Sequence, residues 1–256
     1  MGKVIAVTNQ KGGVGKTTTG INLAASLAHS SRKVLLIDID PQGNATVGSG
    51  IDKDREGLVT IYDVLMGNED VGAAVVATPN EFDMIPANGD LSGAQVELLD
   101  ELGRELRLKS ALAPVRNDYD YILIDCPPAL NLLTVNALTA ADTVIIPMQC
   151  EYFALEGLTD LVNTIKKIRE ALNPNLRIEG LLRTMYDGRN TLSNEVSAQL
   201  QAHFGDKVYE TIIPRNVRIA EAPSHGVPVY TYDATSKGAQ AYLALAGELL
   251  QKERAA

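Results

Sequence analysis

The sequence of 256 residues has little of the material that disulfide frameworks and metal clusters need. It holds two cysteines, Cys126 and Cys150, which are too few for a network of disulfides or a site of four thiolates. Both lie near the ends of apolar runs, so we expect two small buried thiols. The three histidines, His29, His203 and His225, do not pair at metal-ligand or triad spacing. We therefore expect structural or solvated roles for them.

Long apolar runs and an excess of positive charge are also missing. No apolar stretch reaches the roughly 18 residues that a membrane-spanning helix needs. The amino terminus lacks the charged, apolar and small-residue zones of a signal peptide, so we expect a cytoplasmic protein. The formal net charge of −9 excludes a surface coated in positive potential. Residues 38–105 hold fifteen Asp and Glu against three Lys and Arg, whereas residues 170–237 hold eight against seven. A nucleic-acid surface is therefore expected only as a patch in the second half of the chain.

What the chain does have is a glycine-rich loop at residues 11–18, K-G-G-V-G-K-T-T, directly after an apolar run at Val4–Val7. A strand, a glycine turn and a helix start make a phosphate cradle, because glycines let the backbone wrap around an anion with its N–H groups inward. The helix N-terminus adds partial positive charge, Lys16 can reach the β- and γ-phosphates, and the Thr17 hydroxyl can bind Mg²⁺. The predicted nucleotide-binding residues here are Lys11, Gly12, Gly13, Val14, Gly15, Lys16, Thr17 and Thr18.

Alternating apolar runs and helical patterns predict one α/β domain over residues 1–256. Continuous apolar runs are typical of parallel strands that are covered on both faces. The expected strands are Val4–Val7, Val34–Asp38, Phe82–Pro86, Tyr121–Asp125, Thr143–Pro147, Ile178–Leu182 and Val208–Ile213. The expected helices are Ile21–Ala28, Ile61–Met66, Val71–Val76, Leu91–Val115, Leu132–Ala140, Leu155–Leu172, Ser193–His203 and Lys237–Gln251, and residues 45–60 are expected to be a mobile loop. This order predicts a doubly wound, mostly parallel sheet with helices on both faces.

Carboxylates end two of these strands. In such sheets ligands bind beyond the carboxyl ends of the strands, where the glycine loop, Asp40 and Asp125 all fall. Asp125 suits a group that holds Mg²⁺, and its alternative role is to cap the next turn. Asp38 and Asp40 are two residues apart and point to the same side if the strand continues that far. One of them could then orient the water that attacks the γ-phosphate, and the alternative is a turn made by Asp40 and Pro41.

Several long motifs in one order resemble a known family. The loop carries Gln10 in place of the usual first glycine and an additional lysine, Lys11. This loop, D-I-D-P-Q-G-N and D-C-P-P are similar to the deviant Walker A P-loop NTPases of the ParA/MinD superfamily. C-E-Y-F-A-L-E-G-L and I-P-R-N-V-R-I-A-E-A-P-S-H-G resemble the ParA/Soj branch, which partitions chromosomes and plasmids. The resemblance covers nearly the whole chain.

The resemblance implies an ATPase with slow intrinsic turnover, and it implies ATP and Mg²⁺ as cofactors. Lys11 would reach the nucleotide of the partner subunit across an ATP-sandwich homodimer, and Lys16 would hold the β- and γ-phosphates. Thr17 and Asp125 would serve Mg²⁺, and Asp40 would activate the water. The positions that match the adenine contacts are Pro214 and Asn216.

The implied partners are non-specific double-stranded DNA of the nucleoid and a ParB-type centromere-binding protein. The chain starts at the first strand, so we expect no additional helix-turn-helix and no specific operator binding. The candidate DNA-binding residues are Arg189, Arg215, Arg218 and Lys237. Arg215 and Arg218 are neighbours if their stretch is helical. The alternative is that these cations form scattered surface ion pairs with Glu221 or Asp233.

Two other classes of function compete with DNA segregation. A membrane-surface ATPase of the MinD kind needs a basic amphipathic tail. The charges of residues 244–256 nearly cancel, and we expect their leucines to pack on the sheet. An electron-donating ATPase similar to the nitrogenase iron protein needs two cysteines placed to bridge a cluster across a dimer. Neither Cys126 nor Cys150 matches that motif.

Overall fold

One sheet organises the part of the chain that the computed structural model describes, residues 2–255. Within these residues it has eight strands in the order β3-β4-β2-β5-β1-β6-β7-β8. The strands are β1 (Lys3–Val7), β2 (Val34–Asp38), β3 (Val76–Ala77), β4 (Asp83–Ile85), β5 (Tyr121–Asp125), β6 (Thr143–Gln149), β7 (Arg177–Tyr186) and β8 (Val208–Pro214). Only β3 and β4 pair antiparallel among these strands. The predicted doubly wound, mostly parallel sheet is therefore confirmed.

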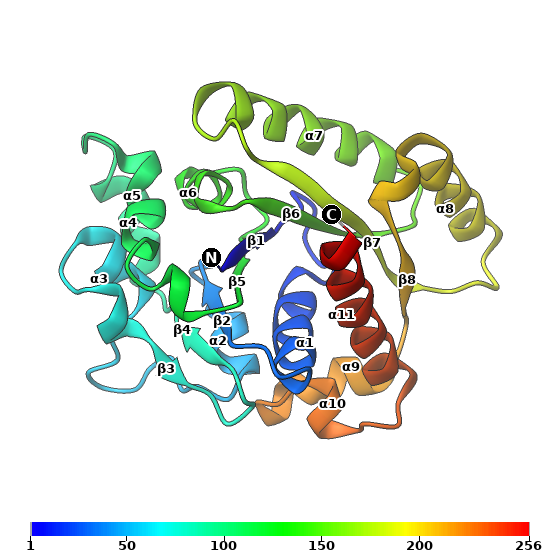
Figure 1. Ribbon diagram of the computed structural model, residues 1–256, viewed down its shortest axis with the longest axis horizontal. Coiled ribbons are helices and arrows are strands. Elements are labelled where there is room, and N and C mark those ends of the chain that lie inside the picture. Colours follow the sequence, from blue (N-terminus) through cyan, green and yellow to red (C-terminus); the bar gives the residue numbers. More distant parts are fainter. Residues whose placement is uncertain (1, 256) are drawn as a thin grey trace.

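Helices cover both faces of this sheet (Figure 1). The α-helices are α1 (Lys16–His29), α2 (Asn44–Gly48), α3 (Ile61–Met66), α4 (Leu91–Glu97), α5 (Arg107–Leu112), α6 (Leu132–Ala140), α7 (Ala154–Ala171), α8 (Thr191–Phe204), α9 (Val217–Glu221), α10 (Val229–Tyr232) and α11 (Lys237–Ala255). The 3₁₀ turns are η1 (Val71–Ala74), η2 (Arg104–Leu106), η3 (Arg116–Asp118), η4 (Gly205–Lys207) and η5 (Ala222–His225). Helices α1 and α11 lie on one face, and α6 and α7 lie on the other.

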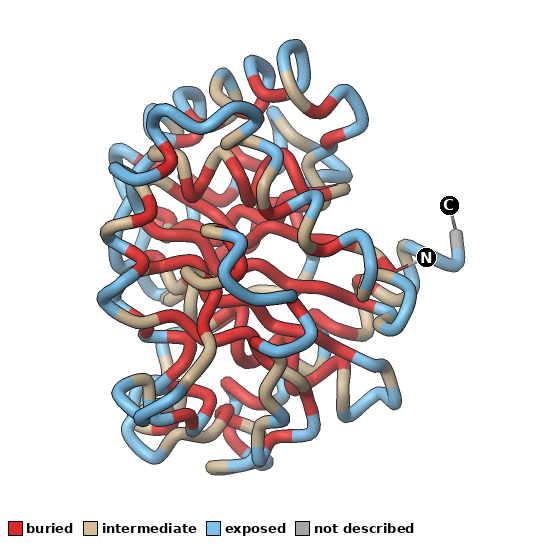
Figure 2. Tube along the Cα trace, turned by 90° about the vertical axis from the view of Figure 1, so that its left-hand side faces the viewer, coloured by how far each residue is buried: buried red, intermediate tan, exposed pale blue. Residues whose placement is uncertain are grey.

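Successive strand residues feed two separate cores, one on each face. In β1, Val4 and Ala6 join the core under α6 and α7, whereas Ile5 joins the core under α1 and α11. In β2, Leu35 and Leu36 divide between the two cores in the same way. This follows from the two-residue period of a strand. Because both faces are covered, the strands run through the interior as buried segments (Figure 2). The carboxyl edge of the parallel strands is left as the place for a site.

Three predicted segments differ from the structure. The helix expected at Val71–Val76 is a 3₁₀ turn, η1, and Val76 already belongs to β3. The region 45–60, expected to be a mobile loop, begins within α2, where Ala45 and Thr46 are fully buried. Helix α2 forms there because the Asp38 carboxylate accepts hydrogen bonds from the backbone N–H and the hydroxyl of Thr46. The helical region expected at Leu91–Val115 is broken into α4 and α5. The break includes Gly103 at φ 70°, in the left-handed region that favours glycine.

The sequence pattern also missed several short elements, among them the helix next to the candidate DNA-binding arginines. Helix α9 begins at Val217 and is capped by Asn216, so Arg215 lies before the helix and Arg218 within it. The condition under which these two arginines would be neighbours, a helix that holds both, is therefore not met. Helix α10, β3 and the antiparallel β3–β4 pair were not predicted either. These elements are four residues or shorter, and so carry no complete hydrophobic period.

Candidate functional site

The glycine loop joins β1 to α1 at the carboxyl edge of the sheet. Gly13 and Gly15 adopt φ 71° and 88°, which other residues rarely adopt, and Lys16 begins α1 directly afterwards. The N-terminus of α1 therefore opens onto the loop, with its free N–H groups and partial positive charge. This is the cradle for an anion that the sequence predicts.

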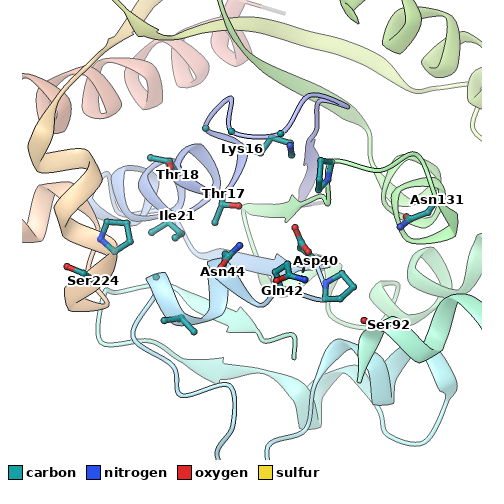
Figure 3. A pocket seen from close by; sticks show the side chains of 18 of the residues that line it. Lys16, Thr17, Thr18, Ile21, Asp40, Gln42, Asn44, Ser92, Asn131 and Ser224 are labelled. Atoms are coloured by element: carbon teal, nitrogen blue, oxygen red, sulfur yellow. Dashed lines mark hydrogen bonds between the residues drawn. The ribbon is translucent and has the colours of Figure 1, made fainter. Parts of the chain in front are cut away.

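A cavity of about 850 Å³ lies in front of this loop. Its walls are formed by Gly12, Gly13, Gly15, Lys16, Thr17, Thr18, Ile21, Asp40, Pro41, Gln42, Asn44, Val47, Gly48, Ser92, Gln95, Pro128, Asn131, Met185, Pro223 and Ser224. Figure 3 shows Lys16, Thr17 and Asp40 converging on it from two elements, α1 and the turn after β2. Six of the eight predicted loop residues and the predicted catalytic acid thus share one cavity. The buried side chain of Val14 instead packs in the interior.

Lys16 is the cation of this cavity. Its Nζ donates a hydrogen bond of 3.0 Å to the carbonyl oxygen of Lys11, within the loop itself. Burial lowers the pKa of Lys16, and the negative charges of Asp125 and Asp40 oppose that effect. A buried ammonium held at a loop carbonyl can exchange that bond for a phosphate oxygen, which is a charge-assisted and stronger acceptor.

Asp125 ends β5 and is fully buried behind the loop. Neither of its carboxylate oxygens has a hydrogen-bond partner of normal geometry. Burial raises the pKa of Asp125 well above its usual range, and Asp38 raises it further, whereas the Thr17 hydroxyl lowers it. A buried carboxylate with unpartnered oxygens is costly unless a cation accompanies it. Asp125 and Thr17 therefore fit the two oxygen ligands that a chain supplies to Mg²⁺ when phosphates supply the others.

Asp38 and Asp40 have different surroundings, because β2 ends at Asp38. Asp38 accepts hydrogen bonds from the Thr46 N–H at 2.9 Å, the Thr46 hydroxyl at 2.8 Å and the Asp40 N–H at 3.1 Å. Burial raises the pKa of Asp38 to about 6 despite these bonds. Asp40 lines the cavity and accepts one bond of 3.0 Å from the Gln42 N–H. Of the two acids, only Asp40 is placed to meet a ligand, while Asp38 holds α2 against β2.

The second lysine of the loop points out of the cavity wall. Lys11 Nζ forms an ion pair of 2.5 Å with Glu151, and both side chains are about half exposed, at 47% and 50%. Glu151 lies between β6 and α7. Exposed pairs of this kind contribute about 0–1 kcal/mol, so Lys11 can leave Glu151 for a stronger partner at little cost.

The residues predicted to contact the base do not line the cavity. Pro214 ends β8, and Asn216 caps α9 by accepting a hydrogen bond of 3.3 Å from the Ile219 N–H. Pro223 and Ser224 line the cavity instead. They belong to the A-E-A-P-S-H-G stretch, so this signal was present in the sequence. Met185 also lines the cavity and was missed, because nothing in its local sequence distinguishes it from a strand residue.

The candidate basic residues are exposed, and two of them have acidic partners. Arg218 pairs with Glu221 at 2.8 Å and with Asp233 at 3.5 Å, as the surface-pair alternative expects. Arg189 pairs with Asp187 at 2.7 Å, a partner that was not predicted. Arg215 and Lys237 are also exposed.

Comparisons with known proteins agree on the family. The family described as "AAA domain" matches residues 2–178. The sporulation initiation inhibitor protein Soj of Bacillus subtilis is 57% identical over 251 residues, which are 97% of this chain and 98% of that protein. The chromosome partitioning protein ParA of Caulobacter vibrioides is 55% identical over 255 residues, covering 98% and 95%.

A solved structure from Mycobacterium smegmatis, named cobyrinic acid a,c-diamide synthase and bound to an ATP analogue and magnesium, is 40% identical. Its TM-score is 0.85, and the match covers 99% of this chain and 96% of that one. Because its name indicates another activity, the shared fold alone does not decide the function. The higher identity to the partitioning proteins carries more weight.

The fold and the loop define a P-loop nucleoside triphosphatase with a deviant phosphate-binding loop. The chain belongs to the ParA/Soj family of partitioning ATPases. Its cofactors are ATP and Mg²⁺, in agreement with the related solved structure that holds an ATP analogue and magnesium.

Proposed function

We propose that this chain is an ATP-driven switch for DNA segregation, built as a single domain over residues 1–256. ATP joins two monomers, the dimer binds duplex DNA without sequence preference, and hydrolysis releases the DNA. A ParB-type centromere-binding protein accelerates hydrolysis, which is slow without it, and the protein acts in the cytoplasm on the nucleoid. The observation that carries the proposal is an exposed lysine, Lys11, within a loop built for phosphates.

Within this proposal, the cavity residues divide the work of phosphoryl transfer to water. Lys16 holds the β- and γ-phosphates, and Asp40 orients the attacking water from the cavity wall. Thr17 and Asp125 hold Mg²⁺, which when bound neutralises charge on the phosphate oxygens. The protein therefore lowers the barrier by positioning and by charge stabilisation, without a covalent intermediate.

The base is proposed to lie among residues of β8, α9 and the cavity wall. Pro214 offers a flat apolar face, and the amide nitrogen of Asn216 is free of the capping bond that its oxygen makes. Met185, Pro223 and Ser224 already line the cavity. We propose that all five surround the base when nucleotide is bound.

Lys11 is proposed to act across the dimer, on the nucleotide of the partner subunit. Lys11→Ala should weaken dimerisation with a non-hydrolysable ATP analogue by at least about ten-fold, because each subunit loses a charge-assisted bond. Nucleotide binding by the monomer should change much less. Sedimentation velocity over a range of protein concentrations measures the first quantity, and nucleotide titration of the dilute monomer measures the second.

Glu151→Gln is the matched control for Lys11→Ala. It removes the same ion pair within the subunit but leaves the lysine in place. Dimerisation should then be undiminished. If Glu151→Gln weakens the dimer as much as Lys11→Ala, the ion pair is what matters and the role across the interface is wrong.

The DNA surface is proposed to lie around Arg189, Arg215, Arg218 and Lys237. Two of these cations already have acidic partners: Arg189 pairs with Asp187, and Arg218 pairs with Glu221 and Asp233. To bind DNA, both arginines must exchange these carboxylates for phosphates. Such exposed pairs cost little to exchange. One monomer then offers too few contacts for firm binding, and a dimer doubles the number and steepens the salt dependence. DNA affinity therefore depends on ATP through dimerisation, and no contact with the bases is needed.

Arg218→Ala and Arg189→Ala should each weaken DNA binding of the ATP-bound dimer by about ten-fold near 0.1 M salt, equally on all sequences. Both should leave ATP-dependent dimerisation intact. Lys166→Ala is the control, since Lys166 is 72% exposed and also paired with an acid, Glu170, but lies on α7. Fluorescence anisotropy on duplexes of random sequence provides the affinities. Parent-like binding by both arginine variants at matched salt would place the surface elsewhere.

The leucines of the C-terminal helix bear on the competing membrane-surface function. Leu245 and Leu249 of α11 are fully buried in the core under α1, as expected of leucines that pack on the sheet. No helix within residues 2–255 is long and apolar enough to cross a bilayer.

The cysteines bear on the competing electron-donating function. Cys126 and Cys150 are both buried and free, as expected of small buried thiols.

A further inference from the structure

Two side chains from strands that are distant in the sequence hold carbonyl groups of the nucleotide loop. The Thr184 hydroxyl of β7 donates a hydrogen bond of 2.7 Å to the Val14 carbonyl. The Gln149 side-chain amide of β6 donates one of 3.1 Å to the Gly13 carbonyl. Thr184 is 2% exposed, so its bond is shielded from water. We call Thr184 and Gln149 the loop clasp.

The clasp restricts the direction of the Val14 and Gly15 N–H groups in the loop. A trans peptide is planar, and its C=O and N–H point in opposite directions. Holding the Gly13 carbonyl toward β6 therefore turns the Val14 N–H away from that strand. Holding the Val14 carbonyl toward β7 does the same for the Gly15 N–H. Gly13 and Gly15 flank these peptides at left-handed φ angles, and because glycine samples many backbone conformations, the two hydrogen bonds restrict peptides that could otherwise turn.

The strand that carries Thr184 also reaches the proposed DNA surface. The next residue, Met185, has a φ of 49° although it is not glycine, and it lines the cavity. Such backbone strain in a cavity wall persists only where the surroundings hold it. One residue further, the Tyr186 carbonyl accepts a hydrogen bond of 3.2 Å from the Arg215 N–H. The segment Thr184–Tyr186 thus contacts the loop at one end and a candidate DNA-binding residue at the other.

We propose that Thr184, assisted by Gln149, is a positioning residue for the nucleotide loop, and that Thr184–Tyr186 couples the loop to the surface around Arg215. The first part concerns only nucleotide binding. The second part rests on the proposed DNA-binding function. Thr184 itself does not line the cavity within the described residues, so its effect is exerted through the loop.

Thr184→Val tests the first part, since it keeps the shape of the side chain and removes the donor. We expect ATP and ADP to bind about ten-fold more weakly. The buried Val14 carbonyl would lose its hydrogen-bond partner, and the loop could then turn away from the orientation that binds phosphate. Thr184→Ser restores the hydroxyl and should return the affinity to within about three-fold of the parent. Titration with a fluorescent nucleotide measures these values. Equal affinity of Thr184→Val and the parent overturns the positioning role.

Thr139→Val separates positioning from general loss of stability. Thr139 is fully buried, and its hydroxyl also donates a bond of 2.7 Å to a carbonyl, that of Val135 in α6. This variant should lose stability in denaturant without losing nucleotide affinity. If both valine variants lose affinity equally, the clasp has only a structural role.

The second part is tested at nucleotide concentrations that saturate every variant. Under these conditions the ratio of DNA affinity with ATP to that with ADP should be smaller for Thr184→Val than for the parent. An unchanged ratio overturns the coupling, whatever the nucleotide affinity shows. If the parent itself has a ratio of one, the proposed function fails, while the nucleotide titrations still decide the role of Thr184.

Discussion

Lys16→Ala should bind ATP at least about 100-fold more weakly than the parent, because the charge that faces the phosphates is lost. Lys16 is the cation inside the cavity, and its Nζ now rests on the Lys11 carbonyl. Without it, the negative charges of Asp125 and Asp40, which now act on Lys16, would be uncompensated and would repel the phosphates. Isothermal titration calorimetry with ATP and Mg²⁺ measures the affinity directly.

Lys33→Ala serves as the matched control for Lys16→Ala. Lys33 is exposed and precedes β2, at the opposite edge of the sheet from the cavity. Its removal changes the net charge by the same amount and should leave ATP affinity within about two-fold, since distant surface charges are screened. If Lys16→Ala keeps ATP affinity within a few-fold of the parent, the assignment of residues 11–18 as the nucleotide-binding loop is wrong.

Asp40→Ala should lower kcat by at least about 100-fold while ATP still binds, since the loss of a positioned base or water-orienting group typically costs that much. In the proposed site the phosphate contacts come from the loop and would remain, so nucleotide affinity should hardly change. The ATP-bound dimer should accumulate, because it is no longer converted to monomers by hydrolysis. Phosphate release at saturating ATP and gel filtration with ATP provide the two readouts.

Asp40→Asn decides between catalysis and a merely structural turn. Its side-chain oxygen can still accept the bond that Asp40 receives from the Gln42 N–H, but it carries no charge. A catalytic Asp40 predicts the same loss of kcat as in the alanine variant. If Asp40→Asn hydrolyses ATP at the parent rate, the acid only shapes the turn, and the role belongs elsewhere.

The sequence predicted the sheet and the phosphate-binding loop of the cavity because those features have strong local patterns. Continuous apolar runs mark parallel strands, and the glycine loop fixes where the first helix begins. The carboxyl ends of parallel strands meet at one edge, so the sequence alone was enough to place Asp40 and Asp125 beside the loop. The sequence could not separate Asp38 from Asp40, because that depends on where β2 ends and on Thr46 eight residues later.

What the sequence could not predict depends on contacts between distant residues. Thr184 bonds a residue 170 positions away, and Gln149 one 136 positions away, so no spacing rule finds the clasp. The ion pair between Lys11 and Glu151 is likewise non-local. Met185 enters the cavity through a backbone angle that its residue type does not favour. These features follow from the topology of the sheet, which places β6 beside β1 and β7 beside β6.

The most direct test of the central claim compares DNA binding in two nucleotide states. The parent protein is titrated against random-sequence duplex DNA at one fixed salt concentration, with Mg²⁺ and either a non-hydrolysable ATP analogue or ADP. The account predicts at least about ten-fold tighter binding with the ATP analogue, with a steeper salt dependence, because dimerisation doubles the phosphate contacts. Equal affinity in the two states, or no DNA binding in either, would contradict the claim that ATP controls binding to DNA.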